Sequence, residues 1–219
     1  PSQIVLKLST SKSELSIFYS TDGSTPTLQS KKYTEPIIVS NSCTFKALAF
    51  NAKSSAGDIL EEEYTLHKGV GLAVKLENEP SSNYQANSGK AALLNGISGS
   101  AAFADGEWVA WEGKDMVATI TLGKDSVEKV SMNFHNQVSA WIHHPQHFEM
   151  YSSEDGINFK KIAEKTIQKS AKQTLTVSLN FAKTKSKYLK VVAHHLTIPE
   201  GFNGEGKPAW IFIDEIAID

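Results

Sequence analysis

Three histidines and a tryptophan crowd one short stretch of the chain. The stretch begins at Trp141 and has the sequence WIHHPQH, so that His143 and His147 lie four residues apart. Imidazole is a common metal ligand, and this spacing presents two ligands on one face of a helix. Pro145 stands between the two histidines, however, and proline breaks a helix interior. We therefore expect no catalytic metal here, while ligand contact, a structural role and solvation stay open for His143, His144 and the later His194.

Adjacent carboxylates near the end of the chain could in principle carry out acid–base chemistry. Asp214 and Glu215 lie within an isoleucine-rich run that is typical of a strand. Adjacent strand residues point to opposite faces, so these carboxyl groups cannot face each other across a glycosidic bond. The chain has one cysteine, Cys43, and neither a GxSxG nor an HExxH motif. We predict no catalytic residues and no enzyme activity for this chain by itself.

The charge composition limits the expected partners. All 22 basic residues are lysine, because the sequence contains no arginine. Arginine is the preferred residue for bidentate contacts to phosphate and guanine, so we expect no nucleic-acid partner. No apolar run approaches the roughly 18 residues that a membrane helix needs, and we expect no membrane insertion.

The start of the chain and its cysteine content bear on location. The sequence opens on Pro1 and shows no charged segment followed by an apolar one, so we expect a fragment of a longer protein. Cys43 has no partner for an internal disulfide, whereas secreted eukaryotic proteins of this size often carry paired cysteines. A bacterial envelope protein is compatible with this count.

Residues 3–66 are predicted to form a small β-domain. Apolar residues alternate at Ile4, Leu6 and Leu8, which is typical of a strand. Further strands are expected at residues 15–20, 36–39, 44–50 and 59–66. Short strands without helical periodicity favour a small immunoglobulin-like β-sandwich.

Glycines at positions 69 and 71 indicate a junction that divides the chain into residues 1–67 and 68–219. Asp155-Gly156 between two apolar runs predicts a β-hairpin. Strands are expected at 118–122, 127–134, 148–152, 159–162, 174–179, 188–193 and 211–218, with long loops at 77–113 and 194–209. Many strands separated by long loops indicate a jelly-roll sandwich.

Three runs in the first part form a recognisable pattern: IFYSTDGSTPT from Ile17, SKKY from Ser30 and TFKALAF from Thr44. They resemble the small C-terminal domain that follows the catalytic barrel in bacterial chitobiases and β-N-acetylhexosaminidases. This resemblance implies an accessory region of a bacterial glycoside hydrolase. It also implies the enzyme's own catalytic domain, ahead of Pro1, as a partner, and a location in the periplasm, at the cell surface or outside the cell.

A second set of residues runs through the rest of the chain. Its members are LNG from Leu94, Trp108, Trp111, Asp115, ATITLG from Ala118, WIHHP from Trp141, Ser152, Asp155-Gly156, Phe159, YLKV from Tyr188 and WIFIDEI from Trp210. They are similar to the discoidin, or coagulation factor 5/8 type C, domain. The resemblance implies a discoidin-like (galactose-binding-like) jelly-roll β-sandwich, and many such domains serve bacterial glycosidases as carbohydrate-binding modules.

The same resemblance implies a sugar site among the loops. Sugars stack an apolar face on an aromatic ring while polar groups meet their hydroxyls. Trp111 and Trp210 adjoin core strands and are expected mainly to pack. The predicted carbohydrate-binding residues are Trp141, His143, His144, His194, Phe202 and Asn203. The expected ligand is a glycan of galactose or N-acetylhexosamine type. Galactose-binding relatives commonly use an arginine that this chain lacks, so a different sugar and a site that binds nothing both stay open.

Many relatives hold a structural Ca²⁺ between an early loop and the last strand, and Ca²⁺ takes six to eight oxygen ligands. The matching residues are Asn95, Ser100, Asp214 and Glu215. The family usually has aspartate at the position of Asn95, so a loop held by hydrogen bonds alone stays open beside the calcium site.

The sequence thus predicts an all-β chain, with a small immunoglobulin-like sandwich followed by a discoidin-like jelly roll. The predicted function is that of a non-catalytic carbohydrate-binding accessory region. The alternative is a structural or protein-interaction module that packs against the catalytic domain or a partner and binds no sugar.

Overall fold

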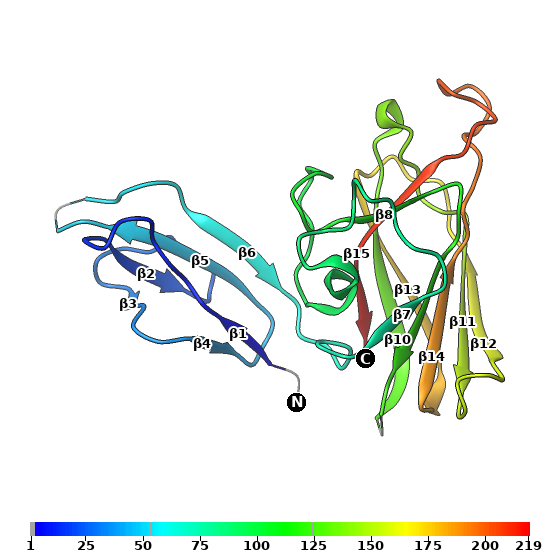
Figure 1. The fold of residues 1–219 in the computed structure, drawn as a ribbon, viewed down its shortest axis with the longest axis horizontal. Helices are drawn as coiled ribbons and strands as arrows, with labels where there is room; N and C mark the ends of the chain where they lie inside the picture. The colour runs from blue at the N-terminus through cyan, green and yellow to red at the C-terminus, as the bar shows by residue number, and fades with distance from the viewer. Residues whose placement is uncertain (1–2, 53, 124) are drawn as a thin grey trace. The chain divides into compact units, whose positions relative to one another are not determined.

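The computed structural model describes residues 3–52, 54–123 and 125–219, and within them nearly every regular element is a β-strand (Figure 1). The exceptions are two short 3-10 helices, η1 (Gly89–Leu94) and η2 (Val138–Ala140). The predicted all-β fold is confirmed. Neither helix of the described residues is long and apolar enough to span a membrane.

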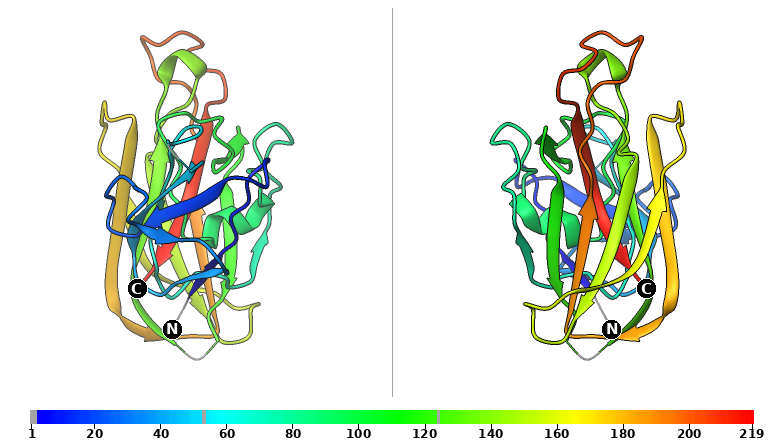
Figure 2. Two further views of the ribbon diagram at one scale, coloured as in Figure 1. Left: turned by 90° about the vertical axis from the view of Figure 1, so that its left-hand side faces the viewer. Right: turned by 90° about the vertical axis from the view of Figure 1, so that its right-hand side faces the viewer.

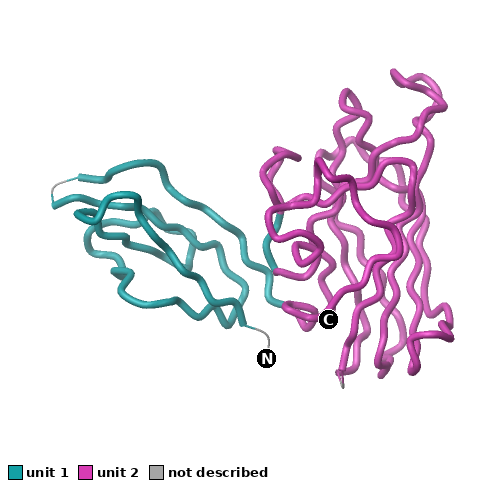
Figure 3. Tube along the Cα trace, viewed as in Figure 1, with its two compact units in different colours: residues 1–66, 96–98 teal, residues 67–95, 99–219 magenta. Residues whose placement is uncertain are grey.

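The chain divides into two compact units (Figure 3). Unit 1 comprises Pro1–Leu66 and Gly96–Ser98, and unit 2 comprises His67–Asn95 and Gly99–Asp219. Within unit 1 the short segment Gly96–Ser98 is held by strand β6 (Leu60–Tyr64), because Ile97 forms a β-bridge with Tyr64 and the Ser98 N–H donates to the Glu63 carbonyl.

Unit 1 is a small sandwich of two antiparallel sheets. One sheet pairs β1 (Ile4–Leu6) with β4 (Ile37–Val39), and the other has the order β3-β2-β5-β6. The strands not yet defined are β2 (Ser16–Ser20), β3 (Lys31–Lys32) and β5 (Cys43–Phe50). Phe45 is fully buried and packs against Tyr19 and Tyr64. The predicted immunoglobulin-like sandwich is confirmed. Strand β3 was not predicted, because its two lysines show no apolar pattern.

Unit 2 is a sandwich of two larger antiparallel sheets (Figures 1 and 2). The sheets have the strand orders β13-β10-β15-β8 and β12-β11-β14-β9-β7. The strands are β7 (Val74–Leu76), β8 (Val109–Glu112), β9 (Met116–Thr121), β10 (Ser126–His135), β11 (His147–Ser153), β12 (Lys160–Thr166), β13 (Thr174–Lys185), β14 (Tyr188–Ala193) and β15 (Trp210–Ile218). Buried apolar side chains from both sheets, among them Phe134, Phe148 and Ile213, form one core. The predicted jelly-roll sandwich is confirmed.

The expectation of one long loop over residues 77–113 is wrong. This segment contains η1 and β8, and η1 buries Ala92, Leu93 and Leu94 in the core. Strand β8 exists because it pairs with β15, so that Val109 lies opposite Ile213. Such a short element is stabilised by tertiary pairing rather than by its own sequence pattern.

The hairpin predicted at Asp155-Gly156 is confirmed. Strands β11 and β12 pair antiparallel around it, and Gly156 has a φ of 74°. The Asp155 carboxylate accepts hydrogen bonds from the backbone N–H groups of Ile157 and Asn158. These bonds favour the charged form and hold the pKa of Asp155 well below its usual range.

Helix η2 and the loop of residues 194–209 lie at the same end of unit 2 (Figures 1 and 2). Ile142 ties this end to the core, since it forms β-bridges with both Gln137 and Trp210 and is itself buried. Strand β11 starts at this end, and its hairpin with β12 therefore lies at the far end of the strand.

Candidate functional site

A pocket of about 450 Å³ opens among the loops at this end of unit 2. Its lining residues lie within three segments of the chain, at positions 136–146, 167–171 and 196–202. Its volume lies within the range of about 300–1,000 Å³ that is typical of small-ligand sites. Three of the six predicted carbohydrate-binding residues line it: His143, His144 and Phe202.

Phe202 presents the aromatic surface of this pocket. Its side chain is 42% exposed, although it stands edge-to-face with the nearly buried His143, with ring centroids 5.4 Å apart. The Phe202 N–H donates to the Pro199 carbonyl, which fixes the loop that carries the ring. An exposed ring on a hydrogen-bonded loop is suited to stacking against an apolar ligand face.

The two histidines of the pocket wall are uncharged at neutral pH. Burial lowers the pKa of His143, and it lowers the pKa of His144 to about 4. A neutral imidazole offers one hydrogen-bond donor and one acceptor. Among the described residues, neither Nε2 atom has a hydrogen-bond partner. Both Nε2 atoms are themselves buried, so they lie behind the surface of the pocket wall in this conformation.

Trp141 does not line the pocket. It has a positive φ of 63°, and Lys207 Nζ lies over its ring, 5.1 Å from the centroid. A Cβ atom at Gly204, which itself has a φ of +90°, would come within 2.7 Å of the Trp141 ring. The ring therefore packs against the 194–209 loop, and sugar stacking on Trp141 stays a prediction.

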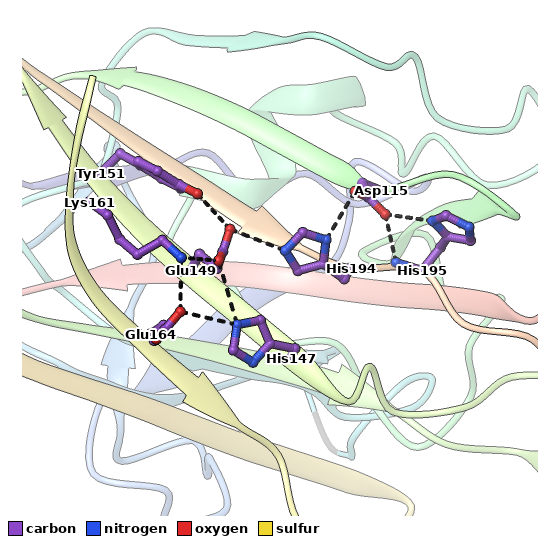
Figure 4. A network of polar contacts seen from close by, with 8 residues as sticks. All are labelled: Asp115, His147, Glu149, Tyr151, Lys161, Glu164, His194 and His195. Carbon is purple, nitrogen blue, oxygen red and sulfur yellow. Dashed lines mark hydrogen bonds and ion pairs between the residues drawn. The ribbon is translucent and has the colours of Figure 1, made fainter. Parts of the chain in front are cut away.

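The remaining two predicted carbohydrate-binding residues also lie outside the pocket lining. Asn203 is exposed in the 194–209 loop. His194 follows β14 and contacts Asp115 and Glu149 within a polar network (Figure 4). The sequence did not indicate this network, because the residues of the network come from four separate segments of the chain.

The other tryptophans are structural. Trp108 and Trp111 are each 1% exposed, and Trp111 donates its indole N–H to the Asn78 carbonyl. Trp210 packs edge-to-face on Tyr84, with ring centroids 5.4 Å apart. The packing roles predicted for Trp111 and Trp210 are confirmed.

Glu215 and Asn95, which belong to the predicted calcium ligands, have protein partners that would compete with an ion. Glu215 is buried, and its Oε1 lies 3.0 Å from Nε2 of His67. The amide group of Asn95 donates to Glu107 Oε2 at 3.1 Å. Glu107 was missed in the sequence, since nothing in its neighbourhood marks it as a partner of Asn95.

Asp214 gives the calcium prediction more support. Asp214 Oδ2 accepts the Gly99 N–H at 2.7 Å, while Oδ1 is buried with no partner among the described residues. Burial raises the pKa of Asp214 to about 7. A bound cation would satisfy such an oxygen. Ser100, by contrast, is exposed and its carbonyl accepts the Trp108 indole N–H. The set fits a calcium ion in part, and the ion stays a prediction.

Comparison with known families agrees with both halves of this fold. Residues 1–61 match the chitobiase/β-hexosaminidase C-terminal domain, and residues 78–209, more than half of the chain, match the F5/8 type C domain. The chain belongs to the F5/8 type C family. Both resemblances noted in the sequence are confirmed, and the loop-end pocket lies within the F5/8 type C domain.

Several solved structures are similar to this F5/8 type C chain, whereas no curated protein matches it. Chitosan-binding module 1 of a chitosanase/glucanase from Paenibacillus sp. IK-5 is 14% identical over 70% of this chain and 98% of its own, with a TM-score of 0.46. A module from Clostridium perfringens, solved with GalNAc-β-1,3-galactose, is 20% identical over 67% of this chain and 94% of its own, with a TM-score of 0.44. A fucose-binding module from Streptococcus pneumoniae is 12% identical over 70% and 97%, with a TM-score of 0.45.

Proposed function

We propose that the F5/8 type C unit is a carbohydrate-binding module whose sugar occupies the pocket at its loop end. The observation that carries this proposal is the placing of an exposed ring, Phe202, beside two uncharged imidazoles, His143 and His144. A ring supplies stacking, and the unpaired imidazole nitrogens, which are buried in this conformation, would bind sugar hydroxyl groups after side-chain rotation. Asn136 and Gln146 add amide groups to the wall.

The affinity of such a pocket for one sugar is expected to be low. Few directed contacts must offset the loss of motion on binding, which places the Kd at about millimolar to tens of micromolar. The chain has no arginine to share between sugar hydroxyls, so hydrogen bonding falls to the imidazole and amide groups. We propose a sugar of galactose or N-acetylhexosamine type.

The proposal extends to the longer protein. Residues 1–61 match a domain type of chitobiases and β-hexosaminidases, which supports an accessory region of a bacterial glycoside hydrolase in the periplasm, at the cell surface or outside the cell. In that arrangement the module raises the local concentration of glycan near the catalytic domain. The chain itself would not hydrolyse glycosides.

One observation favours the second candidate function, a docking surface for protein. Val138 is 38% exposed at the rim, and the pocket wall also includes Ile167, Leu196 and Pro199. An apolar surface of this kind is also suited to a packed protein segment. The sugar titration separates the two functions.

The proposed function is tested by titrating the 219-residue chain with galactose, N-acetylgalactosamine, N-acetylglucosamine and chitobiose, followed by heteronuclear NMR. We expect at least one sugar to shift the resonances of His143, His144 and Phe202. The variant Phe202→Ala should weaken that binding by about tenfold or more, because a central ring often contributes around 2 kcal/mol.

Ile157→Ala is the matched control. Ile157 is an apolar side chain, 81% exposed, in the hairpin at the far end of β11, and its loss should leave sugar affinity unchanged. Absence of shifts with all four sugars at millimolar concentration, or equal effects of the two variants, would contradict the proposal and favour protein docking.

A further inference from the structure

A second group of polar side chains lies on one face of the five-stranded sheet of unit 2. His147 and Glu149 are two residues apart on β11, so both point to the same face. Strand β14 pairs with β11 so that Ala193 lies opposite Phe148, which places His194 beside His147. On the other side, β12 places Glu164 directly opposite Glu149. The strand register alone therefore gathers two imidazoles and two carboxylates.

The ring and carboxylate atoms converge closely (Figure 4). One ligating atom each from His147, Glu149 and His194 can be chosen so that all three lie within 4.8 Å of one another. His194 Nε2 is 3.2 Å from Glu149 Oε2, and His147 Nε2 is 3.6 Å from Glu149 Oε1. Glu164 Oε2 lies 3.5 Å from the same His147 nitrogen.

Asp115 fixes the orientation of one of these imidazoles. Its Oδ2 lies 3.1 Å from His194 Nδ1, while its Oδ1 accepts the backbone N–H of His195 and contacts the His195 ring. With Nδ1 of His194 held by a carboxylate, Nε2 is directed toward Glu149 and His147. A carboxylate behind a ligating imidazole is the usual support for a metal-bound histidine.

We propose that His147, Glu149 and His194 form a binding site for a divalent transition metal of the Zn²⁺ type, with Glu164 or water as the fourth ligand. Two imidazole nitrogens and a carboxylate suit Zn²⁺, whereas Ca²⁺ and Mg²⁺ prefer oxygen ligands throughout. Tetrahedral zinc at bond lengths of about 2.1 Å needs ligand atoms about 3.4 Å apart. Small side-chain rotations from the present distances are enough.

Lys161 competes with the metal ion for the carboxylates of this site. Its ammonium group contacts both Glu149 Oε1 and Glu164 Oε2, the second at 2.9 Å. The pairing of β11 with β12 is irregular between Met150 and Tyr151. As a result, Lys161 lies on the same face as Glu164, although the two are three residues apart. A metal ion must displace this ammonium group, so the lysine lowers the affinity of the site.

The test is calorimetric titration of the 219-residue chain with ZnCl₂ near pH 7.5, with CaCl₂ and MgCl₂ as comparisons. We expect one Zn²⁺ per chain with a Kd in about the micromolar range. His147→Gln and His194→Gln should each weaken zinc binding by about 100-fold, and Asp115→Asn by about tenfold. Lys161→Met should strengthen it by about tenfold, because it removes a competing cation.

His195→Gln is the matched control, since this imidazole contacts Asp115 but is not a proposed ligand. It should change the Kd by less than the His147 and His194 variants do. Co²⁺ substitution supplies a spectroscopic check, because a tetrahedral site gives intense visible absorption that His194→Gln should abolish. Backbone NMR spectra of each variant confirm that the sheet remains folded.

Three outcomes would overturn the proposal. The first is no zinc binding by the wild-type chain up to 1 mM, about a thousandfold above the expected Kd. The second is zinc binding that His147→Gln and His194→Gln leave intact, which would place the ion on other histidines. The third is equal affinity for Ca²⁺ and Zn²⁺, which would contradict a site with nitrogen ligands.

Discussion

His67→Ala is expected to lower the free energy of unfolding of unit 2 by about 3–5 kcal/mol, because it removes a hydrogen-bond donor from a buried carboxylate. Nδ1 of His67 accepts the backbone N–H groups of Gly69 and Ile218. The ring proton therefore lies on Nε2 and is donated to Glu215, which is 3% exposed. The alanine variant removes this donor from a buried carboxylate and also removes an acceptor from two backbone groups.

Urea denaturation followed by tryptophan fluorescence measures this loss. All four tryptophans, at positions 108, 111, 141 and 210, lie in unit 2, so the signal reports unit 2 alone. Lys129→Ala is the control, because it breaks the exposed Lys129–Asp219 pair and should cost less than about 1 kcal/mol. A loss for His67→Ala no larger than that of the control would show that the buried pair adds little stability.

Acidification from pH 6.5 to pH 4 should cost the wild-type chain about 3 kcal/mol more than the His144→Asn variant. Burial lowers the pKa of His144 from 6.5 to about 4, so the unfolded chain binds the proton more readily than the folded chain. Stability from this residue is therefore complete above pH 6.5 and is lost as the pH falls toward 4. A pKa displaced by about 2.5 corresponds to about 3 kcal/mol.

Urea denaturation of both proteins at several pH values measures this difference. Burial raises the pKa of Asp214 to about 7, which changes stability in the opposite sense, but this contribution is common to both proteins and cancels. Parallel stability profiles for the wild type and His144→Asn would contradict the assigned role of His144.

The sequence predicted the strands that carry their own pattern. Strands predicted at residues 148–152 and 188–193 correspond to β11 and β14, and Asp155-Gly156 indicated the hairpin that follows β11. Strands β3, β7 and β8 were not predicted, because each is four residues or fewer and is held by pairing with a neighbour. Pairing partners far apart in the chain leave no local signal.

The two candidate sites differ in how far the sequence reveals them. His143 and His144 were predicted as ligand-binding residues because they cluster with Trp141, and both histidines line the pocket. The proposed metal site was not predicted from the sequence. His143 and His147 have the four-residue spacing of helical ligands, whereas His147 and Glu149 have the two-residue spacing that places both side chains on one face of a strand. His194 lies beside His147 because β14 pairs with β11, and this pairing is seen only in the folded sheet.

The fixed loop at Trp141 has a consequence for binding kinetics. A left-handed backbone at a non-glycine residue costs about 1–2 kcal/mol, and the bridges of Ile142 to Gln137 and Trp210 hold it in place. The conformational entropy of the loop that carries the pocket residues His143 and His144 is thus lost during folding rather than during ligand binding. A ligand of the pocket should bind in a single fast step without a slow conformational phase, and affinity differences between ligands should appear mainly in their dissociation rates.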